Sequence, residues 1–92
     1  MQEYNAMWLS TDGHGFLRVP WSVFNTVYFI PSVFSVHDSD YVYLEEDCDG
    51  PNFLRECPDL KPSEPYQTRE EINEFTQYID ILFQLGRSFN DE

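Results

Sequence analysis

The densest group of ionisable side chains lies in the middle of the chain, where four carboxylates and one thiol occupy five successive positions. Glu45, Glu46, Asp47 and Asp49 supply the carboxylates, and Cys48 stands among them. Neighbouring carboxylates act as general acids and bases when burial raises the pKa of one of them. Because this run ends an apolar stretch and leads into a turn, we expect it to be exposed to solvent. It is then either a solvated run of charge or a surface that binds a positively charged partner, and catalysis is not expected of it.

The same run has a spacing that resembles a calcium-binding loop of the EF-hand type. Such loops place carboxylates at positions 1, 3, 5 and 12 and a glycine at position 6, which here correspond to Glu45, Asp47, Asp49, Glu56 and Gly50. The pattern departs from the usual one because Glu replaces Asp at the first position, Asn52 occupies the usual aliphatic position, and a strand precedes the loop. Calcium or metal binding through residues 45–56 is therefore kept as an alternative function.

The histidines do not belong to a recognisable catalytic set. His14 lies between two glycines, and His37 stands beside Asp38. Nucleophilic catalysis needs a Ser or Cys next to a base that a third group orients, and no such spacing is present in the sequence. We therefore expect that the protein is not an enzyme and uses no cofactor.

The chain contains two cysteines, Cys48 and Cys57. They are interpreted as reduced thiols, with a short-range disulfide or a zinc site as alternatives. The spacing between the cysteines matches no common zinc pattern, and only His14 and His37 are available as further nitrogen ligands.

The net charge is the most unusual feature of the composition. Among its 92 residues, 17 are Asp or Glu and 5 are Lys or Arg, which gives a formal net charge of −12. Such a chain repels nucleic acid and anionic membranes, and it attracts basic surfaces over roughly 8–10 Å at physiological salt. We therefore expect no direct binding to nucleic acid or membrane, and a protein partner with a basic surface.

The first part of the chain predicts strands joined by short turns. We expect strands over residues 5–10 and 15–19, a short helix within residues 20–29, and a hairpin of residues 32–37 and 41–46. Aromatic and β-branched residues favour strands, and the segments between them are rich in Gly, Asp and Ser. In the last strand Tyr41 and Tyr43 share one face, where they pack in the core or anchor a partner.

The second part of the chain predicts two helices separated by a linker. Asp49 is suited to cap a short helix that has Pro51 in its first turn. Residues 58–67 are proline-rich and predict an extended linker. Thr68 and Glu71 then form the pattern of a capping box, and Gly86 marks the end of the last helix. One face of that helix is apolar, formed by Ile72, Phe75, Ile79, Leu82 and Phe83.

These elements predict an α+β fold in a single domain. We expect a small antiparallel sheet of three to four strands, with a short helix and the C-terminal amphipathic helix packed on one face. Residues 1–57 would form the sheet and the short helices, residues 58–67 the linker, and residues 68–89 the C-terminal helix.

Two segments resemble a family of short proteins encoded by bacteriophages, plasmids and other mobile elements, for which no activity is established. These segments are Gly13-His14-Gly15-Phe16-Leu17-Arg18-Val19-Pro20, and Tyr41-Val42-Tyr43-Leu44-Glu45-Glu46-Asp47-Cys48-Asp49 followed by Phe53-Leu54. The resemblance covers residues 13–57, with Gly50 in place of the usual Ala. It implies a phage or mobile-element gene whose product acts in the cytoplasm of a bacterial host.

Charge and resemblance together predict an inhibitor of host defence. The expected partner is a nucleic-acid-binding protein, such as a CRISPR effector or a restriction enzyme, whose basic channel accepts carboxylates in place of phosphates. A simpler alternative is an acidic accessory protein that inhibits nothing. The start of the chain has no signal-peptide pattern, no apolar run is long enough to span a membrane, and a monomer or dimer is expected. The residues expected to bind the partner are Tyr41, Tyr43, Glu45, Glu46, Asp47, Asp49, Glu70, Glu71, Glu74 and Asp80.

Overall fold

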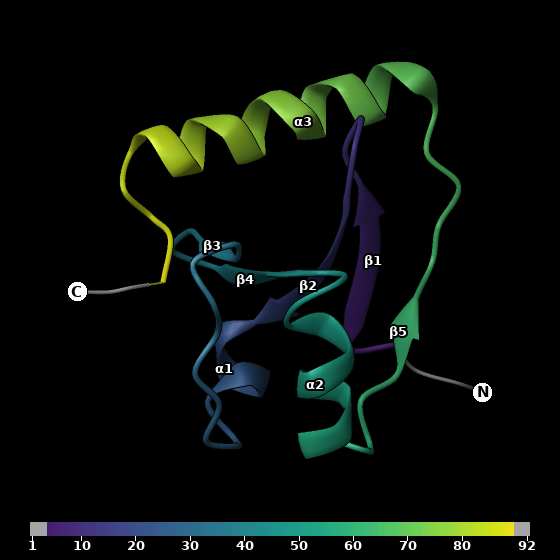
Figure 1. The fold of residues 1–92 in the computed structure, drawn as a ribbon. Helices are drawn as coiled ribbons and strands as arrows, with labels where there is room; N and C mark the ends of the chain where they lie inside the picture. The colour runs from purple at the N-terminus through teal and green to yellow at the C-terminus, as the bar shows by residue number, and fades with distance from the viewer. Residues whose placement is uncertain (1–3, 90–92) are drawn as a thin grey trace.

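The computed structural model describes residues 4–89, and its central element is a mixed sheet of five strands (Figure 1). The strand order is β3-β4-β2-β1-β5. The described range leaves out residues 1–3 and 90–92. Residues 1–3 are part of the segment in which no signal-peptide pattern was found. The strands are β1 (Ala6–Ser10), β2 (Gly15–Pro20), β3 (Val36–His37), β4 (Tyr41–Glu45) and β5 (Pro62–Ser63).

Three antiparallel strands form the centre of the sheet. In the register, Leu17 of β2 lies opposite Trp8 of β1 on one side and Leu44 of β4 on the other. The expected hairpin is confirmed, because β3 pairs with β4 around the turn at residues 38–40. Its first strand is shorter than predicted, since only Val36 and His37 of residues 32–37 join the ladder.

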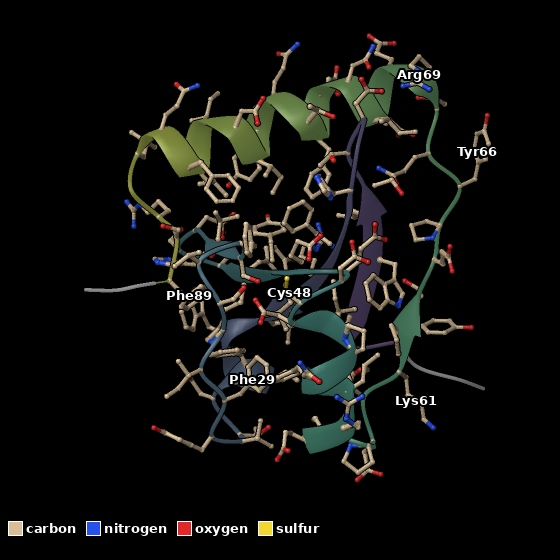
Figure 2. All side chains as sticks on the ribbon, in the orientation of Figure 1. Phe29, Cys48, Lys61, Tyr66, Arg69 and Phe89 are labelled. Atoms are coloured by element: carbon tan, nitrogen blue, oxygen red, sulfur yellow. The ribbon has the colours of Figure 1, made fainter. Side chains whose placement is uncertain are left out.

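Two short helices cover one face of the sheet. They are α1 (Trp21–Phe24) and α2 (Gly50–Glu56). The rings of Phe24 and Phe53 stack with their centroids 5.5 Å apart, and Phe29 packs at the edge of Phe53 (Figure 2). The buried side chains of this face are Ala6, Leu17, Val19, Phe24, Val42, Leu44, Phe53 and Leu60.

One long helix, α3 (Arg69–Gln84), covers the other face (Figure 1). The predicted capping box is confirmed, since Thr68 Oγ1 accepts from the Glu71 amide at 3.1 Å and Glu71 Oε1 accepts from the Thr68 amide at 2.9 Å. Gly86 has a positive φ of 73°, as expected just beyond a helix end. The buried side chains of this face are Phe16, Val36, Tyr43, Ile79 and Leu82.

The prediction that the helices share one face of the sheet is therefore wrong. The sheet lies between two helical layers because the central strands are apolar on both sides. In β4, for example, Val42 and Leu44 point to α1 and α2, whereas Tyr43 points to α3. A strand that is buried on both faces reads as a continuous apolar run.

The prediction of a purely antiparallel sheet of three to four strands is also wrong. The fifth strand, β5, comes from the proline-rich segment and pairs in parallel with β1. Asn5 fixes its start, because its amide donates to the Lys61 carbonyl at 3.1 Å and its side-chain oxygen accepts from the Lys61 amide at 2.7 Å. Pro62 has no amide to donate to the ladder, and an edge strand is where proline is tolerated. None of the helices in residues 4–89 has the length and apolar character needed to cross a membrane.

Candidate functional site

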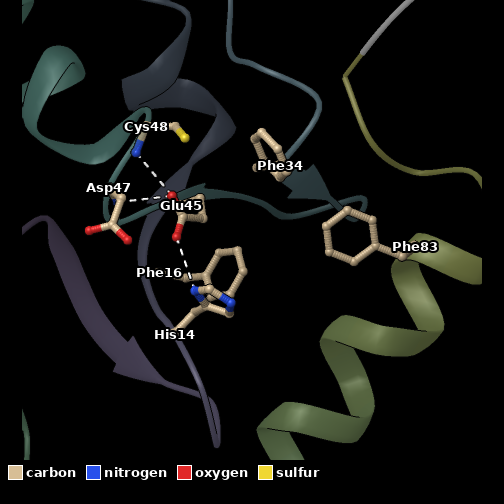
Figure 3. A pocket seen from close by; sticks show the side chains of 7 residues that line it. All are labelled: His14, Phe16, Phe34, Glu45, Asp47, Cys48 and Phe83. Atoms are coloured by element: carbon tan, nitrogen blue, oxygen red, sulfur yellow. Dashed lines mark hydrogen bonds and ion pairs between the residues drawn. The ribbon is translucent and has the colours of Figure 1, made fainter.

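The acidic run begins at the end of β4, and its first carboxylate is buried. Glu45 has a relative exposure of 6%. Its Oε1 accepts hydrogen bonds from the amides of Asp47 at 2.8 Å and Cys48 at 2.9 Å (Figure 3). The side chain therefore closes the turn that follows its own strand, and the prediction that Glu45 is exposed is wrong.

The other oxygen of Glu45 faces a histidine from a different segment. His14 lies in the β1–β2 turn, and its Nδ1 is 3.3 Å from Glu45 Oε2 (Figure 3). The pairing of β2 with β4 brings these turns together, because the Glu46 amide donates to the Gly15 carbonyl at 3.0 Å. A Cβ at Gly15 would meet the carboxylate of Glu46, which shows how closely the two turns approach each other; the exposed end of the Glu46 side chain could swing away from it.

The result is a cluster of one imidazole and three carboxylates: His14, Glu45, Glu46 and Asp47. One ligand atom from each residue lies within 4.8 Å of the others, and within residues 4–89 this is the one group of three or more His, Cys, Asp or Glu placed to hold a metal ion. Glu46 and Asp47 are exposed, in agreement with the expectation for the run.

Asp49, in contrast, is directed inward, with a relative exposure of 4%. Its carboxylate accepts from the Ser32 amide at 2.9 Å and the Ser32 hydroxyl at 2.8 Å, and the Ser35 hydroxyl donates to it as well. Asp49 is thus neither exposed nor a side-chain cap of α2. It holds the loop before β3 against the start of α2.

The predicted calcium loop is not formed. The carboxylate of Asp49 is occupied by Ser32 and Ser35, and Glu56 is the last residue of α2. A loop of the EF-hand type would keep residues 45–56 free of helix until its end, whereas α2 begins at Gly50. The residues that do meet include His14, which lies outside the predicted loop.

The two tyrosines of β4 have different surroundings. Tyr43 is buried below α3, where its ring lies 5.8 Å from that of Phe75 and its hydroxyl donates to Asp38 at 2.9 Å. It therefore belongs to the core and is not available as an anchor. Tyr41 is half-buried, and the Arg18 guanidinium lies 4.2 Å above its ring.

The four predicted acids of α3 are exposed: Glu70, Glu71, Glu74 and Asp80. Glu71 is committed to the capping box, so three carboxylates of this helix face solvent without a bond to the fold. Side chains on the outer side of α3 point away from the sheet (Figure 2). Among residues 4–89 the one ion pair of a Lys or Arg with a carboxylate is Arg69–Asp12, so most of the negative charge has no cationic neighbour.

An exposed apolar surface was missed by the sequence analysis. Phe83, predicted to face the core, is 40% exposed, and Phe34 is 56% exposed. Both line a pocket of about 320 Å³ that also includes Phe16, Glu45 and Asp47 (Figure 3). Helical periodicity placed Phe83 at the margin of the apolar face, and periodicity alone does not show how far the sheet extends beneath the helix.

Both cysteines are free and half-buried, so the short-range disulfide is absent from this structure. Partial burial and the adjacent carboxylate of Glu45 raise the pKa of the Cys48 thiol. The environment therefore favours the protonated thiol over the thiolate that binds metal.

No protein-family model matches this chain, and no curated protein or solved structure is measurably similar to it. The class that the fold and the charge define is a strongly acidic α+β protein with a mixed sheet between two helical layers.

Proposed function

We propose that the protein binds a basic surface of a nucleic-acid-binding protein and thereby blocks access of nucleic acid to that surface. The observation that supports this proposal is a group of exposed carboxylates on the outer side of α3 that form no ion pair within residues 4–89. They belong to Glu70, Glu74 and Asp80. Carboxylates on a rigid helix can occupy positions that phosphates take in a basic channel, because both groups are anionic hydrogen-bond acceptors.

The C-terminal half of the same helix adds apolar contact area. Ile81 and Phe83 are 49% and 40% exposed, and Leu85 follows just beyond the helix end at 65%. Protein interfaces combine an apolar centre with polar groups around it. The group of carboxylates and these side chains together define the proposed partner surface, which is called the α3 surface below.

The resemblance of residues 13–57 to proteins of phages and plasmids supports a bacterial host as the setting. Host defence proteins that bind nucleic acid, such as CRISPR effectors and restriction enzymes, offer basic channels of the required kind. The proposal is therefore an inhibitor of host defence that acts in the host cytoplasm. The simpler alternative, an acidic accessory protein, predicts no loss of nucleic-acid binding by the partner.

The experiment compares three forms of the chain as bait in bacterial lysate. The test variant combines Glu70→Gln, Glu74→Gln and Asp80→Asn, and the matched control combines Glu56→Gln, Asp59→Asn and Glu64→Gln, which are exposed acids outside α3. Wild type and control should capture a nucleic-acid-binding protein at low salt and release it at high salt or when duplex DNA or RNA is added. The test variant should not capture it.

A second step uses the purified partner. Wild type should reduce the partner's affinity for nucleic acid, and the α3 variant should not. If both triple variants lose capture equally, only overall charge matters and the α3 surface is wrong. If a captured partner still binds nucleic acid normally, the inhibitor proposal is wrong and the accessory role stands.

A further inference from the structure

The cluster of His14, Glu45, Glu46 and Asp47 is built by the sheet. Phe16 of β2 lies opposite Glu45 of β4 in the register, so the turn before β2 must lie beside the turn after β4. The imidazole and the three carboxylates therefore come from segments that are distant in sequence and fixed by the central ladder. Of these four side chains, the carboxylate of Glu45 is the most firmly held.

Glu45 is positioned before any ligand arrives. Its side chain is 8% exposed, and Oε1 is held by two backbone amides. Oε2 points into the cluster, where His14 Nδ1 lies 3.3 Å away. Burying the charge of a carboxylate is costly, and a bound cation would reduce that cost.

The charge of the cluster also calls for a cation. Three carboxylates lie together, and no Lys or Arg of the described residues forms an ion pair with them. The imidazole of His14 adds a nitrogen atom that can bind a metal ion. Like charges at this separation repel one another, and the repulsion is stronger because one carboxylate is buried. A divalent cation would offset this repulsion, which no Lys or Arg ion pair within residues 4–89 relieves.

From these observations we propose that His14, Glu45, Glu46 and Asp47 bind a divalent transition-metal ion, and that Zn²⁺ is preferred over Mn²⁺ and Ca²⁺. One imidazole and three carboxylates suit zinc, whereas calcium takes oxygen ligands in larger number. Nitrogen-containing sites also bind zinc more tightly than manganese. The inference is independent of the α3 surface.

The distances fit a site that closes on the ion. Ligands of a tetrahedral zinc ion lie about 3.4 Å from one another, and the four donors here lie within 4.8 Å. Glu45 is the fixed ligand, while Glu46 and Asp47 are exposed and free to move inward. The bound ion would join the β1–β2 turn to the end of β4 and hold both against the sheet.

The test is titration of the metal-stripped chain with Zn²⁺, followed by calorimetry and by the ¹⁵N resonances of the histidine rings. The test variants are His14→Gln and the pair Glu46→Gln with Asp47→Asn. The matched control is His37→Gln, which removes the other histidine and lies outside the cluster. A second control, Cys48→Ser with Cys57→Ser, removes both thiols.

We expect one ion per chain, a shift of the His14 ring resonances, and binding at least tenfold weaker in both test variants. The His37 and cysteine variants should bind as wild type does, and bound Zn²⁺ should raise the melting temperature of every form that binds it. Ca²⁺ and Mn²⁺ should bind more weakly than Zn²⁺.

Three results would overturn the proposal: no saturable Zn²⁺ binding, binding that His14→Gln leaves unchanged, or binding that the cysteine variant abolishes. A clear preference for Ca²⁺ would overturn the choice of metal. His14 is exposed, so its replacement leaves the core intact, and melting of each variant without metal checks that it is folded. Because no partner is present, the outcome does not affect the α3 proposal.

Discussion

The hydroxyl of Tyr78 on α3 donates a hydrogen bond to the carboxylate of Asp38 in the β3–β4 turn, forty residues earlier in the chain. The same carboxylate accepts from the Tyr43 hydroxyl at 2.9 Å and from the amides of Asp40 at 2.8 Å and Tyr41 at 2.7 Å. Asp38 therefore orders the hairpin turn and attaches it to the long helix.

Tyr78→Phe tests that attachment, since it removes a hydroxyl and keeps the ring. We expect a loss of about 1.5–3 kcal/mol in the free energy of unfolding, the range for a hydrogen bond to a charged group. Urea denaturation followed by circular dichroism measures the difference. Tyr66→Phe is the control, because Tyr66 is 88% exposed, and it should change stability little. Equal effects of the two substitutions would contradict the role given to the Asp38 bond.

The acid stability of the protein should depend on Asp38. Burial raises the pKa of this carboxyl. Hydrogen bonds from the Tyr78 hydroxyl, from the amides of Asp40 and Tyr41 and from the Tyr43 hydroxyl lower the pKa, and together they outweigh burial, so the net shift is downward. A group whose pKa is lower in the folded state stabilises the fold above its unfolded pKa of about 3.9. That contribution is lost as the pH falls through the folded pKa.

Asp38→Asn should therefore be less stable than wild type at neutral pH, and the difference should shrink as the pH falls below about 4. Urea unfolding over a series of pH values measures the free energy of each form. Asp59→Asn, at an exposed position, is the matched control. A difference between wild type and Asp38→Asn that stayed constant down to the acid limit would show that the charge of Asp38 contributes nothing.

The sequence predicted best what depends on neighbouring residues. Thr68 and Glu71 are three positions apart and form their capping box without help from the sheet. Gly86 ends α3 because it adopts a positive φ. The turn between β3 and β4 is local in the same sense, since Asp38 accepts from amides two and three residues later.

What the sequence did not predict depends on distant partners. Asp49 looked exposed within an acidic run, yet it is buried by Ser32 and Ser35, which lie 17 and 14 residues earlier. Likewise, β5 forms because β1 offers an edge more than fifty residues away. The candidate metal cluster requires the β2–β4 register, and spacing along one segment does not contain that information.

The buried bonds of Asp49 should contribute substantially to stability. Ser35→Ala removes a hydroxyl that donates to Asp49 and accepts from the Glu45 amide at 3.0 Å, and we expect a loss of at least about 1.5–3 kcal/mol, the range for a hydrogen bond to a charged group. Asp49→Asn should cost more, since it places an amide group where several donors converge. Chemical denaturation measures both, with Ser39→Ala at an exposed turn position as control. If Asp49→Asn were as stable as wild type, the network would not hold the loop.

Gly50 stands at the start of α2, and the structure gives a reason for glycine at this position. A Cβ built at Gly50 would lie 2.8 Å from Cη2 at the far end of the Trp8 ring and 3.3 Å from Cζ3. Trp8 is half-buried and packs against the core of this face. Gly50→Ala therefore forces the indole to move, and we expect a net loss of about 1–3 kcal/mol.

The collision can be tested by removing its other partner. Trp8→Phe shortens the ring, so Gly50→Ala should be much less harmful in that background than in wild type. A double-mutant cycle from urea denaturation gives the coupling free energy between the two positions, which should amount to about 0.5–3 kcal/mol. Gly13→Ala is the matched control: nothing lies within 4 Å of its Cβ position, and a stabilising change of about 0.4–1 kcal/mol is expected from the less flexible unfolded chain. If Gly50→Ala cost the same with Trp8 and with Phe at position 8, contact with the indole would not be the reason for glycine.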